Sequence, residues 1–196
     1  MKIIFASANK NKISEIKGLL HGKYEVLSLK DIGIEEDIPE PGATIKENSF
    51  LKANYVLNFM KEHKMERVPV FADDSGLEVV ILNNAPGVYS ARYAGEPKND
   101  SNNNKKLLIA LTNELNRAAR FVTVITLIIN EEIHYFEGEV KGHLINEEKG
   151  NTGFGYDPLF VPQGYKNTFA ELGSEIKNTI SHRAMAINKL LGFLKK

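Results

Sequence analysis

The chain has 196 residues, with 25 lysines and arginines, 25 aspartates and glutamates and no cysteine. This length suits one domain with a substantial core, and the balanced charge argues against a nucleic-acid polymer or an anionic membrane as partner, since these usually require a basic face. The absence of cysteine excludes disulfides, thiolate metal sites and cysteine nucleophiles. The N-terminal apolar run is too short for a signal peptide, and no stretch approaches the roughly 20 apolar residues of a membrane helix. We therefore expect a soluble, cytoplasmic protein.

The first part of the chain alternates between strand and helix. Residues 2–7 have the apolar run of a buried strand, residues 11–20 have helical spacing, and residues 24–29 have the pattern of a second strand. A T-x-x-E capping box at Thr44 and Glu47 then opens a long helix, which we expect to end near position 63.

In the middle of the chain, polar residues interrupt a run of apolar residues. Two short strands are predicted at 68–73 and 76–82, with Asp73 and Asp74 where the first of them runs out. Because neighbouring side chains of a strand point to opposite faces, the two carboxylates are not expected to act as one clamp. The loop at 83–100 has little regular pattern, and loops of this length are usually functional or mobile.

The second half is predicted to contain a helix at 101–116, two long strands at 120–130 and 132–145 joined by a tight turn, a short strand at 159–162 and a closing helix from Ser181. The strand at 120–130 is apolar on both faces, so we place it centrally in a sheet with helices on each side. No repeat or change of composition marks a domain boundary. The pattern predicts an α/β fold with a mixed, twisted sheet flanked by helices.

The turn from the first strand into the first helix has features of an anion site. A helix N-terminus offers free N–H groups and a partial positive charge, and "SANKNK" adds Ser7, Asn9 and Lys12. This arrangement suits a polyphosphate, although the P-loop motif is absent. The alternative is that Asn9 or Asn11 only caps the helix and that Lys12 is solvated.

Carboxylates supply a second candidate site. Magnesium is usually held by one or two carboxylates together with waters and substrate phosphates, and Asp74 follows an apolar run in which a bare carboxylate requires a partner or a function. Glu47 is already explained by the capping box, and the acidic residues 35–37 resemble a solvated loop.

Two further stretches contain unusual combinations of residues. In "GNTGFGYDP" at 150–158, the glycines permit close approach of a ligand and Phe154 could stack on a base; the alternative is an aromatic side chain packed in a tight turn. In "SHRA", Ser181 is a good N-cap, which places His182 and Arg183 in a first helical turn that mildly disfavours positive charge.

Taken together, the segments "SANKNK", "PEPGATIKENSFLKA", "FADDSGLEV", "APGVYSARYAG", "GFGYDPLF", "FAEL" and "SHRA" resemble the inosine triphosphate pyrophosphatase family. The resemblance implies that residues 1–196 form one elongated, two-lobed domain with a nucleotide cleft between the lobes, and that the protein is a homodimer. It also implies Mg²⁺-dependent cleavage of ITP, dITP and XTP to the monophosphate and pyrophosphate, which keeps deaminated purines out of DNA and RNA.

The resemblance also implies roles for individual residues. Ser7, Asn9 and Lys12 would bind the triphosphate, Glu40 and Asp74 would hold the metal, and Asp74 with Lys12 would be catalytic. Ser75 would contact the substrate, and the base would be bound by Phe154, Gly155, Tyr156, Asp157, Lys177, His182 and Arg183.

Base choice depends on hydrogen-bond donors. Hypoxanthine and xanthine have a 6-oxo acceptor beside N1–H, whereas adenine has an amino donor, so donors from His182, Arg183 or loop N–H groups would oppose adenine. Three alternatives stay open: a pyrophosphatase of other modified nucleotides, a non-catalytic nucleotide-sensing module, and a single-stranded nucleic-acid binder that stacks bases on Phe154 and Tyr93.

Overall fold

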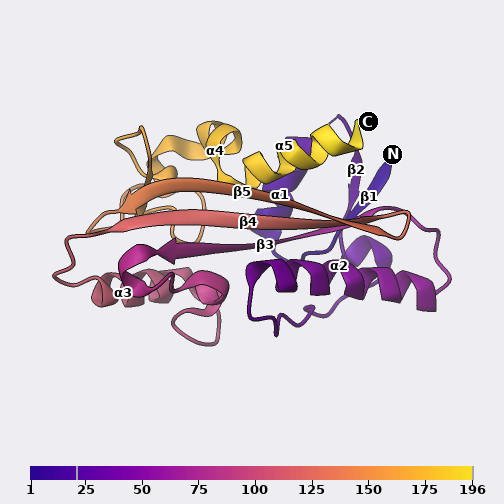
Figure 1. Ribbon diagram of the computed structural model, residues 1–196, viewed down its shortest axis with the longest axis horizontal. Helices are drawn as coiled ribbons and strands as arrows, with labels where there is room; N and C mark the ends of the chain where they lie inside the picture. The colour runs from indigo at the N-terminus through magenta and orange to yellow at the C-terminus, as the bar shows by residue number, and fades with distance from the viewer. Residues whose placement is uncertain (21, 196) are drawn as a thin grey trace. The chain divides into compact units, whose positions relative to one another are not determined.

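The computed structural model describes residues 1–20 and 22–195 (Figure 1). A six-stranded sheet has the order β2-β1-β3-β4-β5-β6 and is flanked by helices. The strands are β1 Lys2–Phe5, β2 Glu25–Leu27, β3 Val70–Val79, β4 Ala118–Ile129, β5 Glu132–Leu144 and β6 Phe160–Pro162. The α-helices are α1 Lys10–Leu20, α2 Ile45–Glu62, α3 Asp100–Ala110, α4 Phe169–Ile180 and α5 His182–Leu194, and the 3₁₀ helices are η1 Lys30–Ile32, η2 Val80–Leu82 and η3 Gly87–Arg92.

The sheet is mixed, as the sequence predicts. β1 is parallel to both β2 and β3, and β5 is antiparallel to β6. β4 and β5 are joined by Asn130 and Glu131, whose φ angles of 51° and 69° are those of a tight two-residue hairpin turn. The predicted turn at this position is therefore confirmed.

The chain divides into two compact units. The first comprises Met1–Asp74, Val124–Glu137 and Ala186–Lys196, and the second comprises Ser75–Thr123 and Gly138–Met185. Each of the three longest strands, β3, β4 and β5, passes from one unit into the other. In β3 the boundary is the peptide bond between Asp74 and Ser75.

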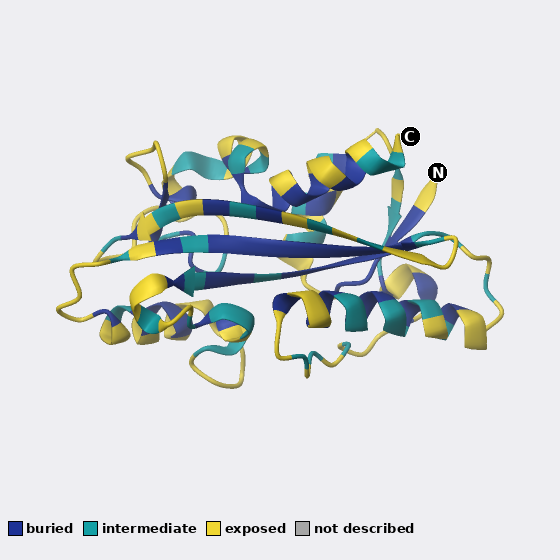
Figure 2. Ribbon diagram, in the orientation of Figure 1, coloured by how far each residue is buried: buried dark blue, intermediate teal, exposed yellow. Residues whose placement is uncertain are grey.

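The first unit buries apolar side chains on both faces of its part of the sheet. One cluster joins α1 and α5 to the strands through Ile3, Phe5, Ile16, Leu20, Phe71, Ile125, Leu127, Ala186, Ile187, Leu190 and Leu191. The other joins α2 to the strands and includes Ile4, Ala6, Ala53, Val56, Met60, Val70, Ala72 and Ile128. β4 is buried along most of its length (Figure 2), which confirms its predicted central place with helices on each side.

The second unit has one core. α3, α4 and the strands meet at Leu77, Val79, Leu107, Leu111, Ala119, Phe121, Val140, Leu144, Tyr156, Leu159, Phe160 and Phe169. Phe160 packs edge-on against Phe121, with ring centroids 4.8 Å apart.

The predicted break between the strands at 68–73 and 76–82 is wrong. β3 is one continuous ten-residue strand, and its polar residues lie in the middle instead of at an end. The strand continues because both buried carboxylates have cationic partners, Lys12 for Asp73 and Lys52 for Asp74.

Two other predictions need correction. The helix expected at 101–116 ends at Ala110, followed by Asn113 in a left-handed conformation with φ of 63°. Sequence reasoning missed α4 altogether, because Gly173 interrupts it with φ of 77° and ψ of 173°. The capping box that opens α4, Thr168 with Glu171, was the available signal.

The loop predicted at 83–100 contains the short helix η3 and two cis prolines, Pro86 and Pro97. None of the helices in the described ranges 1–20 and 22–195 has the length and apolar character needed to cross a membrane.

Candidate functional site

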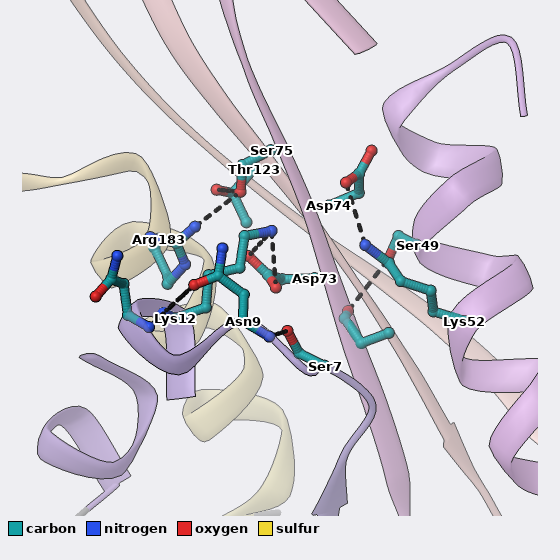
Figure 3. A network of polar contacts seen from close by, with 12 residues as sticks. Ser7, Asn9, Lys12, Ser49, Lys52, Asp73, Asp74, Ser75, Thr123 and Arg183 are labelled. Atoms are coloured by element: carbon teal, nitrogen blue, oxygen red, sulfur yellow. Dashed lines mark hydrogen bonds and ion pairs between the residues drawn. The ribbon is translucent and has the colours of Figure 1, made fainter. Parts of the chain in front are cut away.

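Two adjacent aspartates of β3 point to opposite sides of the strand in the first unit (Figure 3). Asp73 is fully buried and Asp74 is 6% exposed. Strand geometry alone produces this divergence, so each carboxylate meets a different helix: Asp73 faces α1 and Asp74 faces α2.

On the α1 side, Asp73 holds Lys12. The Lys12 ammonium lies 3.2 and 3.1 Å from the two carboxylate oxygens of Asp73. Asn9 caps the helix, since its Oδ1 accepts hydrogen bonds from the N–H groups of Asn11 and Lys12 at 3.0 and 3.1 Å. Ser7 Oγ in turn accepts the N–H of Asn9 at 3.2 Å. The turn therefore brings Ser7, Asn9 and Lys12 together, and the cap weighed as an alternative for Asn9 is present.

On the α2 side, Lys52 joins two of the predicted metal ligands. Its Nζ lies 2.5 Å from Glu40 Oε1 and 3.2 Å from Asp74 Oδ1. Sequence reasoning missed Lys52. The available signal was its position: Lys52 falls in the buried stripe of α2 beside Ala53 and Val56, where an ammonium group requires carboxylate partners.

The loop that carries Glu40 is fixed by the first turn of α2. Glu47 Oε2 accepts the N–H groups of Ala43 and Thr44 at 2.8 and 3.1 Å, and Asn48 Oδ1 accepts the N–H of Gly42 at 2.7 Å. A side chain at Gly42 would place its Cβ 2.6 Å from Asn48 Oδ1, so any other residue here would force the loop or the start of α2 to shift.

Burial and charge shift the ionisation of this cluster. Burial raises the pKa of the Asp74 carboxyl, against the lowering effect of Lys52 and Lys12, and the net result is a pKa above the ordinary value. Burial alone would lower the pKa of Lys52, but the negative charges of Asp74, Glu40 and Asp73 outweigh it and raise that pKa. Asp74 is therefore closer to accepting a proton near neutral pH than an exposed aspartate.

The residues around Asp74 fit a divalent cation. Glu40 and Asp74 both direct an oxygen at the same ammonium group, and Asp74 Oδ2 is buried with no hydrogen-bond partner among the described residues. No group of three or more potential ligands occurs within the described parts of the chain, but Mg²⁺ is usually held by one or two carboxylates, with waters and phosphates completing the shell. The two-carboxylate set matches that preference.

In the second unit, the loop around Phe154 is organised by a buried ion pair. Asp157 Oδ2 lies 2.6 Å from Lys177 Nζ and also accepts the N–H of Phe154 at 2.9 Å. The Lys177 ammonium lies 4.5 Å from the centre of the Phe154 ring. A Cβ at Gly153 would meet Asp157 Oδ2, which explains glycine at this close approach.

The start of α5 supplies His182 and Arg183. Ser181 caps the helix through a 3.2 Å bond from the N–H of Ala184, as the sequence predicts. Arg183 is 1% exposed; its Nη2 donates to Ser75 Oγ at 3.1 Å, and its guanidinium lies 5.8 Å from the Phe154 ring. His182 is buried and stacks on Phe121, with ring centroids 4.7 Å apart.

Tyr156 has a structural place. It lies in the apolar core, its hydroxyl donates to the carbonyl of Ser90 at 2.8 Å, and burial raises the pKa of its phenol. The side chain of Tyr156 is therefore engaged within the core, and its contact with the base stays a prediction.

Each unit contains one part of the predicted site residues. The first unit contains the residues expected to meet phosphate and metal, namely Ser7, Asn9, Lys12, Glu40 and Asp74. The second contains those expected to meet the rest of the nucleotide, namely Ser75, Phe154, Gly155, Tyr156, Asp157, Lys177, His182 and Arg183.

Comparisons with known proteins show the family of the chain. The chain is 51% identical over 195 residues to the dITP/XTP pyrophosphatase of Flavobacterium psychrophilum, covering 100% of both chains, and 50% identical over 194 residues to that of Porphyromonas gingivalis, covering 98% of this chain and 97% of the relative. The solved structure of the Staphylococcus aureus Ham1 protein is similar with a TM-score of 0.87 and 41% identity, covering 100% of this chain and 98% of that one. The family model of the Ham1 family matches residues 3–193. The chain belongs to the Ham1 family.

Proposed function

We propose that this protein is a nucleoside triphosphate pyrophosphatase that hydrolyses deaminated purine nucleoside triphosphates (ITP, dITP and XTP) to the monophosphate and pyrophosphate. The relatives named dITP/XTP pyrophosphatase support the reaction and the substrate class. The observation that carries the proposal is the Asp74 carboxylate: it is buried, paired with Lys52, beside Glu40, and one of its oxygens has no hydrogen-bond partner among the described residues.

The reaction transfers the α-phosphoryl group to water. The water oxygen bonds to the α-phosphorus, the bond from that phosphorus to the bridging oxygen breaks, and the electron pair leaves with pyrophosphate. A proton is lost from the water, and Asp74 is the group placed to accept it, since burial raises its pKa. No covalent nucleophile is required.

The leaving pyrophosphate develops negative charge, which cations of the first unit would balance. Lys12 lies in the first turn of α1, where the helix N-terminus adds partial positive charge. In this structure Asp73 holds Lys12, so Asp73 positions the ammonium group. Lys52 is the second cation, and it is fixed between Glu40 and Asp74.

Glu40 and Asp74 would hold Mg²⁺, which when bound neutralises phosphate charge and lowers the pKa of a bound water. The charges of the cluster support this role. Lys12 and Lys52 contribute two positive charges and Glu40, Asp73 and Asp74 three negative ones, so the group has one negative charge in excess. Bound Mg²⁺ would change that excess into one net positive charge, which favours an anionic substrate.

The base would be recognised by residues of the second unit. Phe154 offers an aromatic face with cations near it, and such a face stacks on any base. Selection for a 6-oxo group requires hydrogen-bond donors, which Arg183 and Lys177 possess as side chains. Adenine would leave such donors facing an amino group, and unpaired buried polar groups can discriminate by about 10⁴–10⁵.

The direct test is the product analysis of ITP, with ATP and GTP in parallel, with and without Mg²⁺. We expect IMP and pyrophosphate from ITP, little turnover of the other two, and a loss of about 10²–10⁴ in kcat for Asp74→Asn, as for other groups that accept a proton in the transition state. Asp37→Asn is the matched control, because it makes the same change at an exposed carboxylate of the loop before Glu40.

Other outcomes would contradict parts of the proposal. Inorganic phosphate as the first product would place the cleaved bond elsewhere in the triphosphate. Full activity of Asp74→Asn would remove Asp74 from the reaction. Tight ITP binding without turnover of any nucleotide would instead favour a nucleotide-sensing module.

A further inference from the structure

The start of α3 is unusually rich in polar side chains that bond to loops. Its sequence, "NDSNNN" at 99–104, begins with Asn99, whose Oδ1 caps the helix by accepting the N–H of Asn102 at 2.9 Å. Asn103 Oδ1 accepts the N–H of Ala94 at 2.7 Å, and its Nδ2 donates to the carbonyl of Ala91 at 3.1 Å. This helix start therefore fixes a neighbouring loop through side-chain hydrogen bonds.

Two other side chains of the same turn engage Gly155. Asp100 Oδ2 accepts the N–H of Gly155 at 2.7 Å, and Asn104 Nδ2 donates to the carbonyl of Gly155 at 3.2 Å. Residues four apart lie on one face of a helix, so α3 holds both backbone polar groups of a single residue. Gly155 has φ of 62°, in the left-handed region that favours glycine. We call this pair of hydrogen bonds the Gly155 clamp.

The Gly155 clamp lies directly beside Phe154. The N–H of Phe154 is bonded to Asp157, and the ring lies within 6 Å of two cationic side chains, Lys177 and Arg183. Three backbone groups around the ring (the N–H of Phe154 and the N–H and carbonyl of Gly155) are thus held by side chains. The direction of the ring depends on that backbone.

The presence of asparagine at position 104 is not explained by a gain in stability. It is 2% exposed, and its Oδ1 has no hydrogen-bond partner among the described residues. A buried unsatisfied acceptor destabilises a fold, and an apolar side chain of similar size would avoid that effect. The bond from Nδ2 to Gly155 is the feature that an apolar residue would lose.

We propose that Asp100 and Asn104 are positioning residues for Phe154: by fixing Gly155 in its left-handed conformation they set the aromatic face on which the purine base stacks. The inference rests on the proposed function, which gives Phe154 its role. It also bears on base choice. The N–H groups of Phe154 and Gly155 are engaged within the protein, so neither of these two donors is available to the 6-oxo group.

The test compares Asp100→Ala and Asn104→Leu with two matched controls. Asp100→Asn removes the charge but keeps an acceptor for the Gly155 N–H, and Asn102→Leu makes the same change as Asn104→Leu at an exposed position of the same helix. We expect KM for ITP to rise about tenfold in Asp100→Ala and Asn104→Leu with kcat within about twofold, because uniform binding is lost. Both controls should behave as the wild type.

Product inhibition separates the base from the phosphates. The inhibition constant of IMP should rise in Asp100→Ala and Asn104→Leu, while that of inorganic tripolyphosphate stays unchanged. Equal increases for both inhibitors, or no increase for either, would overturn the proposal. Asn104→Leu loses the bond to the Gly155 carbonyl but also removes a buried unsatisfied acceptor, so we expect its melting temperature to stay close to that of the wild type; a large decrease would indicate a purely structural role.

A ligand-free measurement makes the Gly155 clamp testable by itself. Hydrogen exchange of the Gly155 amide, followed by NMR, should be faster in Asp100→Ala than in the wild type and in Asp100→Asn. If the wild type hydrolyses ITP and exchange is unchanged, the clamp is wrong and the function stands. If the wild type hydrolyses no nucleotide, the proposed function fails. The Gly155 clamp is then tested by two results alone: faster exchange of the Gly155 amide in Asp100→Ala, and weaker binding of IMP to that variant in calorimetry.

Discussion

Asp73 and Asp74 are adjacent in the sequence but bind different partners. The pair shares one strand and one burial environment, yet Asp73 holds a lysine of α1 and Asp74 a lysine of α2. Alternation along the strand predicted the divergence from the sequence. The partners could not be predicted in the same way, because Lys52 is separated from Asp74 by 22 positions and only the fold brings them together.

Asp74, the proposed proton acceptor, also affects stability through its ionisation. Its folded-state pKa is raised above the unfolded value, so the stability it contributes is full below an unfolded pKa near 3.8 and is lost as pH rises through the folded pKa. Because the raised pKa means that ionisation of Asp74 is unfavourable in the folded state, we expect Asp74→Asn, which cannot ionise and leaves Lys52 paired with Glu40, to be more stable than the wild type at pH 7.

Denaturant unfolding in EDTA from pH 5 to pH 8 measures this difference. The advantage of Asp74→Asn should shrink as the pH is lowered, because the wild-type carboxyl takes up its proton. Added Mg²⁺ should stabilise the wild type and leave the variant unchanged. A variant that is less stable than the wild type at every pH would show that the ion pair with Lys52 outweighs the burial of the charge.

Gly42 offers a test of the loop that carries Glu40. In Gly42→Ala, the new Cβ would meet Asn48 Oδ1 at 2.6 Å and Glu47 Cβ at 2.9 Å. We expect a loss of about 1–3 kcal/mol in the free energy of unfolding and a lower kcat, because the loop and its carboxylate shift.

Gly18→Ala is the matched control for Gly42→Ala. Gly18 lies inside α1 with nothing within 4 Å of an added Cβ, so alanine should stabilise the protein by about 1 kcal/mol. Chemical denaturation of both variants measures the change in stability, and initial rates measure the change in kcat. Equal stability of the two would mean that the loop adapts to the methyl group.

At the scale of elements, the central strands carry a charged ladder on the second unit. Arg120 of β4 lies between Glu78 of β3 and Glu139 of β5, with contacts of 2.7 and 2.6 Å. The hydrogen bond from Arg120 is the main cause that lowers the pKa of Glu139. These pairs are partly exposed, so solvent screens them.

Removal of Arg120 should therefore have a modest, pH-dependent effect. We expect Arg120→Met to lose about 1 kcal/mol at pH 7. Because the folded-state pKa of Glu139 is depressed, its contribution is present above an unfolded pKa near 4.5 and is lost as pH falls through the folded value. The difference between variant and wild type should narrow in unfolding experiments from pH 7 to pH 4.

Arg67→Met provides the comparison for Arg120→Met. Arg67 pairs with Glu131, but both side chains are about two-thirds exposed, at 67% and 68%. We expect little change in its stability. Equal losses in the two variants would show that the cross-strand position of Arg120 adds nothing.

Some helices, strands and turns could be predicted from the sequence and others could not. The hairpin at Asn130 and the capping box of α2 were predictable because each depends on neighbouring residues. α4 was not predicted, because Gly173 breaks its helical spacing. The continuity of β3 was also not predicted, since the charges that interrupt its apolar pattern are compensated only by distant lysines.

At the scale of the whole molecule, the α/β class, the mixed sheet and the central place of β4 followed from the apolar pattern. The ion pair of Asp157 with Lys177 and the Gly155 clamp did not, because each depends on side chains that the sequence separates. The homodimer and the cytoplasmic location stay predictions.

The hydrogen bonds that hold the loops at 42–44 and 154–155 have a thermodynamic consequence. Side chains fix these backbone N–H groups within the protein itself. Much of the conformational entropy of both loops is therefore lost when the chain folds, not when the nucleotide arrives. The binding entropy of IMP or ITP, measured by calorimetry, should accordingly contain only a small unfavourable contribution from loop ordering. A nucleotide would bind to loops that are already ordered.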